Sequence, residues 1–153
     1  MKIKILAFGK LGRGNEQDMV DDYVRRLPWP CEITEFEIKK PAKTAELRKA
    51  QEAEKFLGAI PPGVALIALD ERGKALSSRK FSESITGWTN EGISTIVFII
   101  GGADGLDETV RRKARLTLGF GTLTWPHKLV RVMLTEQLYR AWSISTGHPY
   151  HRD

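Results

Sequence analysis

Hydrophobic residues follow two patterns that alternate from one end of the chain to the other. Short, nearly continuous apolar runs, which are typical of strands, occur at 2–8, 31–38, 64–69, 95–100 and 116–120. Between these runs, apolar residues recur every three or four positions, which is the spacing of an amphipathic helix. The alternation predicts an α/β fold with a mostly parallel sheet flanked by helices. The runs at 64–69 and 95–100 are apolar on both faces, so we expect helices to cover these strands on each side.

Proline and glycine mark the expected ends of the helices. The expected helices lie at about 19–27, 44–58, 78–88, 106–115 and 126–147. Pro28 and Pro30 stop the first helix because proline lacks a backbone N–H, and Pro126 can occupy the first turn of the last helix. The last helix carries apolar residues at three-to-four spacing, which we expect to be buried: Val130, Met133, Leu134, Leu138, Ala141 and Trp142.

Three turns that follow predicted strands combine small, polar and aromatic residues, at 69–73, 101–105 and 120–127. Ligands of open α/β sheets bind beyond the carboxyl ends of the strands, so we expect the three turns to form one site if their strands are neighbours. Two of them also have simpler explanations, because 69–73 can be a solvated turn and 101–105 can be a glycine turn between a strand and a helix. The third turn has aromatic residues near both ends and can enclose an adenine ring.

Composition narrows the class of protein. With 153 residues, 41% of them hydrophobic, the chain suits a single domain over 1–153. No apolar run approaches the roughly 20 residues of a membrane span, and the N-terminal Met-Lys-Ile-Lys is no signal peptide, so we expect a cytoplasmic protein. Cys31 is the only cysteine, so neither a disulfide nor a metal site is expected. The net charge of +5 favours polyanionic partners such as nucleic acid.

Three C-terminal segments carry a specific signature: Thr-Trp-Pro-His-Lys-Leu-Val-Arg-Val at 124–132, Glu-Gln-Leu-Tyr-Arg-Ala-Trp at 136–142 and His-Pro-Tyr-His-Arg at 148–152. The turns Leu-Asp-x-x-Gly-Lys at 69–74 and Ile-Gly-Gly-x-x-Gly at 100–105 precede them in the matching order. Over its whole length the chain therefore resembles the bacterial ribosomal RNA large-subunit pseudouridine N3-methyltransferases, which belong to the SPOUT superfamily.

The resemblance implies a fold and an activity. Members have one α/β domain whose C-terminal part forms a trefoil knot, an exception to the rule that chains are unknotted. They are homodimers that use S-adenosyl-L-methionine to methylate N3 of a pseudouridine in large-subunit (23S) rRNA within the assembled ribosome. Matched motif by motif, the expected cofactor-binding residues are Leu69, Gly101, Gly102, Phe120, Gly121, Thr122, Leu123, Thr124 and Trp125.

The catalytic candidates are Tyr150, His151, Arg152 and Arg140. Methyl transfer from a sulfonium needs a nucleophile that has lost its proton and is held in line. Tyr150 or His151 can take the proton or stack on a flipped nucleobase, and Arg152 can bind phosphate or stabilise the imide anion. Simpler alternatives are a frayed terminus for the tail and an i, i+4 ion pair with Glu136 for Arg140.

Two other functions fit parts of the sequence. A nucleotide-dependent oxidoreductase or phosphotransferase would bind its ligand at 9–14, but this turn lacks both G-x-G-x-x-G and Gly-Lys-Ser/Thr. A non-enzymatic RNA-binding module would use the same positive charge. The basic run that could contact RNA, or form a solvated helix face, is Arg111, Arg112, Lys113 and Arg115. The tryptophans that could lie in a dimer interface are Trp29, Trp88 and Trp142.

Overall fold

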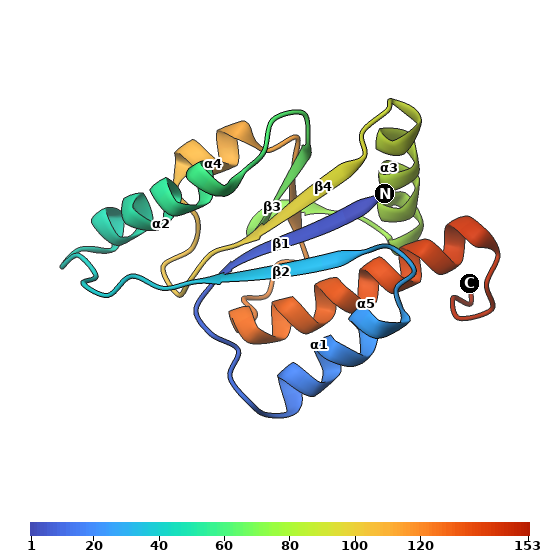
Figure 1. Ribbon diagram of the computed structural model, residues 1–153, viewed down its shortest axis with the longest axis horizontal. Coiled ribbons are helices and arrows are strands. Elements are labelled where there is room, and N and C mark those ends of the chain that lie inside the picture. Colours follow the sequence, from blue (N-terminus) through green and yellow to red (C-terminus); the bar gives the residue numbers. More distant parts are fainter.

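The computed structural model describes residues 1–153, with the strands in one layer between two layers of helices (Figure 1). Strands and helices alternate strictly along the chain. The elements are β1 (Lys2–Phe8), α1 (Asn15–Arg26), β2 (Cys31–Phe36), α2 (Ala45–Ala59), β3 (Ala65–Ala75), α3 (Ser78–Asn90), β4 (Thr95–Ile100), α4 (Glu108–Lys113), β5 (Leu116–Gly119) and α5 (His127–Thr146). The predicted α/β class is confirmed.

The five strands form one sheet in the order β2-β1-β4-β3-β5, and every neighbouring pair is parallel. In register, Phe98 of β4 lies opposite Ile5 of β1 and Ile67 of β3. The middle strand β4 coincides with the predicted run at 95–100, and five of its six residues are buried. The order also makes β4, β3 and β5 consecutive neighbours, so their carboxyl ends meet at one edge of the sheet.

Helices cover both faces of the sheet, with α1, α3 and α5 on one side and α2 and α4 on the other (Figure 1). Alternate residues of a strand point to opposite faces, so Ile3 and Ile5 belong to the first core while Leu6 and Phe8 belong to the second. On the second face Phe56 of α2 is fully buried. Both cores therefore contain strand and helix side chains, which hold the sheet in place beneath the edge where its strands end.

The structure corrects the expected turn at 69–73, because β3 continues to Ala75. After Leu69 the pairing with β5 shifts in register, so that Lys74 and Ala75 lie opposite Leu118 and Gly119. The strands approach closely there: a Cβ on Gly73 would lie 2.6 Å from the carbonyl carbon of Leu118. Pairing with β5, a partner distant in sequence, thus extends the strand through residues that by themselves indicate a turn.

The last helix differs from the expected one in its start and in its buried face. Pro126 is the N-cap and stands just before the first turn. Leu134, Leu138 and Ala141 are buried as expected, whereas Val130, Met133 and Trp142 are only half-buried. The helix buries polar positions instead: Arg131, Thr135 and Ser143. The C-terminal trefoil knot implied by the resemblance stays a prediction. None of the helices combines the length and the apolar composition that a membrane span requires.

Candidate active site

The segments 69–72, 100–106 and 118–125 meet in one cavity, which lies at the carboxyl ends of β4 and β5 and beside the second half of β3. The first residues of α5 complete its wall with His127 and Val130. Apolar side chains, among them Leu69, Ile100 and Leu118, line part of the cavity, and carboxylates of the turns line another part. The structure thus brings together the three turns that the sequence singled out.

Seven of the nine expected cofactor-binding residues line this cavity: Leu69, Gly101, Gly102, Phe120, Leu123, Thr124 and Trp125. Gly121 borders an adjacent cavity, which shares Leu118, Gly119 and Phe120 with the first. Thr122 is exposed. Sequence reasoning included His127 in the turn at 120–127 but gave it no role. It did not assign the apolar wall positions Ile100, Leu118 and Val130 to the site, because apolar residues there are also expected of an ordinary core.

Side-chain hydrogen bonds fix the aromatic turn between β5 and α5. The indole Nε1 of Trp125 donates to the carbonyl oxygen of Phe120 at 3.1 Å and so ties one end of the turn to the other. The Thr124 hydroxyl donates to Glu71 Oε2 at 2.6 Å. This second bond connects the aromatic turn to β3 along the wall of the cavity. Leu123, the residue before Thr124, remains 69% exposed.

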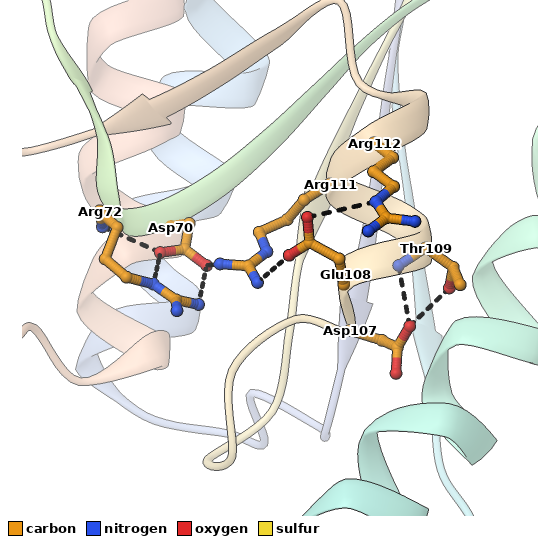
Figure 2. Close-up of polar contacts among 7 residues, drawn as sticks. All are labelled: Asp70, Arg72, Asp107, Glu108, Thr109, Arg111 and Arg112. Carbon is orange, nitrogen blue, oxygen red and sulfur yellow. Dashed lines mark hydrogen bonds and ion pairs between the residues drawn. The ribbon is translucent and has the colours of Figure 1, made fainter.

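Asp70 is the centre of an ion-pair network beside the cavity (Figure 2). Arg72 donates to its carboxylate from Nε at 3.1 Å and from Nη2 at 3.2 Å, and Arg111 of α4 lies 3.6 Å away on the other side. Glu108 in turn pairs with both Arg111 and Arg112. The network joins α4 to β3, and Arg111 and Arg112 of the predicted RNA-contacting run are therefore engaged within the protein.

The charge state of the cavity follows from these contacts. Burial raises the pKa of Asp70, but the hydrogen bonds from Arg72 and the attraction of Arg111 outweigh it, so the net pKa is lowered. Asp70 is thus ionised at neutral pH and a poor proton acceptor. Burial and the neighbouring Arg131 and Lys128 lower the pKa of His127, so this imidazole is neutral at pH 7.

Three of the four catalytic candidates form a cluster around Glu136 in the middle of α5. Glu136 Oε1 accepts hydrogen bonds from the Tyr150 hydroxyl and from Arg140 Nε, both at 3.0 Å. Arg140 Nη1 lies 3.3 Å from His151 Nδ1, and since arginine only donates, this nitrogen is the acceptor. The Glu136–Arg140 ion pair considered from the sequence is present. Arg152 is exposed and has no side-chain partner.

This tail cluster does not line the cavity of the three turns. Arg140 comes thirteen residues after His127, a separation of about 20 Å along a helix. Tyr150 packs edge-on against Tyr139, with 4.7 Å between ring centroids. Burial raises the pKa of Tyr150, and its contacts with Tyr23 and Glu136 raise it further, so the phenol keeps its proton at neutral pH.

A buried ion pair anchors the start of α5 to β2, the edge strand on the other side of the sheet from β5. The Arg131 side chain is 2% exposed; its Nη1 donates to Glu35 Oε2 of β2 at 2.6 Å and its Nη2 to the Gly9 carbonyl at 3.1 Å. The Leu11 amide donates to the same Glu35 oxygen at 2.6 Å. The turn after β1, where a nucleotide-binding enzyme would hold its ligand, is thus occupied by an internal contact.

An open parallel sheet whose adjacent strand ends form one cavity defines a ligand-binding α/β protein. The family model of predicted SPOUT methyltransferases matches residues 1–151. The chain therefore belongs to the SPOUT methyltransferase family, and the resemblance noted in the sequence is confirmed.

Two curated relatives and two solved structures illustrate this relationship. The chain is 47% identical over 152 residues to the ribosomal RNA large subunit methyltransferase H of Rhodospirillum centenum, and equally to that of Paramagnetospirillum magneticum, with 99% of each chain covered. A probable methylase family protein from Haemophilus influenzae has a TM-score of 0.58 at 10% identity and matches 99% of this chain and 70% of its own. A SpoU methyltransferase from Streptomyces viridochromogenes, in complex with the cofactor AdoMet, has a TM-score of 0.52 at 13% identity and matches 96% of this chain and 61% of its own. The two structures show a shared fold.

Proposed function

We propose that this protein transfers a methyl group from S-adenosyl-L-methionine to N3 of a pseudouridine in large-subunit rRNA of the assembled ribosome. The observation that carries the proposal is the single cavity between β3 and the ends of β4 and β5, lined by seven of the nine residues matched to the family's cofactor site. Near-full-length relatives whose names specify large-subunit ribosomal RNA support the substrate class.

The cavity suits a ligand that combines an adenine ring with a positive charge. Leu69, Ile100 and Leu118 offer apolar surface for a flat ring. Three carboxylates also line the cavity, and two of them, Asp70 and Asp104, are paired with Arg72 and Arg48. Glu71 accepts its hydrogen bond from the uncharged Thr124 hydroxyl, so its charge favours a cation. When bound, S-adenosylmethionine supplies an electrophilic methyl group, and the protein's contribution is to hold that group in line with the nucleophile.

The tail cluster acts on the RNA side of the reaction. Tyr150 keeps its proton, so in this proposal it stacks on the nucleobase. His151 takes the proton of the weakly acidic imide at Nδ1, after Arg140 has moved from this nitrogen to the developing anion. Arg140 has a raised pKa, caused by its hydrogen bond to Glu136, and remains a cation that can stabilise the imide anion. Exposed Arg152 is available for a phosphate group.

In a homodimer, the tail of one chain would reach the cavity of its partner, since the tail cluster does not line the cavity of its own chain. Large apolar side chains are exposed beside the cavity and on the neighbouring part of α1, including Leu123 at 69% and Met19 at 48%. Such residues mark contact surfaces when they cluster. Trp142 and Trp29 are half-buried and can contribute to the interface, whereas Trp88 is 8% exposed and belongs to the core.

Calorimetry with S-adenosylmethionine and with a nicotinamide dinucleotide tests the cofactor assignment. The proposal predicts saturable binding of the first and none of the second, with a stoichiometry of at most one per chain. Binding of the dinucleotide alone would refute it.

Analytical ultracentrifugation of the same sample tests the proposed homodimer. A monomer at micromolar concentration would contradict the homodimer.

A further inference from the structure

Helix α2 holds the glycine turn between β4 and α4 from the side opposite the cavity. Glu52 Oε1 accepts a hydrogen bond from the backbone N–H of Gly102 at 2.9 Å. Glu52 is only 9% exposed although its side chain is ionisable. A Cβ on Gly102 would lie 2.9 Å from the same oxygen, so only glycine lets the carboxylate approach the backbone this closely. The contact thus fixes a residue that lines the cavity.

A second contact from the same face of α2 holds the turn two residues later. Arg48 lies four positions before Glu52, which places both on one side of the helix. Its Nε and Nη2 donate to the Asp104 carboxylate at 2.7 and 3.1 Å, a bidentate pair. Its Nη1 donates to the Lys43 carbonyl at 3.1 Å, which limits the movement of the arginine itself. The turn is therefore held at Gly102 and at Asp104.

The cost of burying Glu52 indicates that packing alone does not explain it. Its helix neighbours Ala53 and Phe56 belong to the second core, where an apolar side chain would avoid the loss of hydration. Burial raises the pKa of Glu52, and the nearby charge of Asp104 raises it further. The hydrogen bond from the Gly102 N–H and the charge of Arg48 lower the pKa, but the net shift is upward. A carboxylate kept at this place supplies one feature that a hydrocarbon lacks, an acceptor directed at the Gly102 amide.

We propose that Glu52 is a positioning residue of the cofactor cavity, which sets the Gly101–Gly102 wall before the ligand binds. The inference rests on the proposed function, because it takes the cavity to be the site of S-adenosylmethionine. Glu52 itself contacts the turn from behind and does not line the cavity. It therefore acts on cofactor affinity through the backbone of Gly102 and leaves the chemical step unchanged at saturating cofactor.

Two conservative variants of the full chain separate hydrogen-bond reach from charge. Glu52→Gln keeps an oxygen at the same distance and loses the charge, whereas Glu52→Asp keeps the charge and retracts the acceptor by one methylene. We expect Glu52→Asp to raise the Kd for S-adenosylmethionine about tenfold, the effect of one lost hydrogen bond, and Glu52→Gln to stay within about threefold. Glu54→Asp, an exposed position on the same helix, is the matched control and should bind like the wild type.

Two readouts accompany the calorimetry. Amide hydrogen exchange in the ligand-free chain should be faster at Gly102 in Glu52→Asp than in the wild type or Glu52→Gln. Methyl transfer at saturating cofactor should keep its kcat within about twofold in all variants, with the change confined to KM for the cofactor.

The outcomes distinguish this inference from the proposed function. A wild-type chain that binds no S-adenosylmethionine refutes both. A wild-type chain that binds it, together with a Glu52→Asp variant of equal affinity and unchanged Gly102 exchange, refutes only the role of Glu52. Equal weakening in Glu52→Gln and Glu52→Asp also refutes it, because an acceptor oxygen kept within reach of the Gly102 amide would then not preserve the affinity.

Discussion

Replacing Arg131 by methionine is expected to lower the free energy of unfolding by about 3 kcal/mol at pH 7. Removal of one partner of a buried ion pair costs roughly 3–5 kcal/mol. The lower end applies because the Glu35 side chain is 32% exposed and keeps its hydrogen bond from the Leu11 amide. The Gly9 carbonyl also loses its donor. Methionine fills much of the same space, so the loss reports on the polar contacts.

The loss should depend on pH in a defined direction. Burial raises the pKa of Glu35, but the hydrogen bonds from Arg131 and Leu11 and the charge of Arg131 leave it lowered overall. A carboxyl whose pKa is lowered by folding stabilises the fold above the pKa of the unfolded chain, and this contribution disappears as the pH falls through the folded-state pKa. The difference between wild type and Arg131→Met should therefore be full at pH 7 and shrink below the ordinary glutamate pKa.

Urea unfolding monitored by tryptophan fluorescence measures both effects. Lys128→Met, at an exposed position of the same helix, is the control and should change the unfolding free energy by less than about 0.5 kcal/mol. A difference below about 1 kcal/mol for Arg131→Met, or one that stays constant into the acid range, would show that the pair does not anchor α5 as described.

Three further perturbations test the sheet edge, the cavity and the tail. Gly73→Ala should lower stability by about 1–3 kcal/mol through overpacking against Leu118; thermal unfolding measures it, and an unchanged midpoint would contradict the close approach. Trp125→Ala should weaken S-adenosylmethionine binding about tenfold in calorimetry, since it removes an aromatic wall and the bond to Phe120; equal affinity would place the ligand elsewhere. Removal of 150–153 should abolish methyl transfer while cofactor affinity stays within about threefold; retained turnover would exclude a catalytic tail.

The order of elements could be predicted because each strand and helix carries its own pattern. The run at 95–100 gave the bounds of β4 because five of the six residues are buried and no polar alternation competes. The cavity could be anticipated from the same reasoning, since parallel strands end at one edge of the sheet. What the pattern left open was which strands are neighbours, and the order β4-β3-β5 supplied that.

Features that depend on contacts distant in sequence could not be predicted. The residues after Leu69 look like a polar turn, and only pairing with β5 makes them a strand. Arg131 interrupts the apolar face of α5, and its burial becomes understandable only when Glu35, ninety-six positions earlier, lies beside it. Glu52 likewise has no local signal, because its partner is a backbone amide fifty positions away.

The position of the tail was the least predictable part of the site. The sequence named Tyr150 and His151 without placing them, and in the structure they join Glu136 and Arg140 rather than the cavity. The spacing of apolar residues along the sequence does not show where a terminal segment turns back on its own helix. Under the proposed homodimer, the relation between the tail and the cavity depends on the partner chain.

Incubation of the protein with isotopically labelled S-adenosylmethionine and ribosomes that lack this modification tests the central claim most directly. Mass spectrometry of the digested large-subunit rRNA should find the labelled methyl group on N3 of one pseudouridine. A label on another nucleotide or on protein, or ribosomes left unlabelled by a chain that binds the cofactor, would contradict the account.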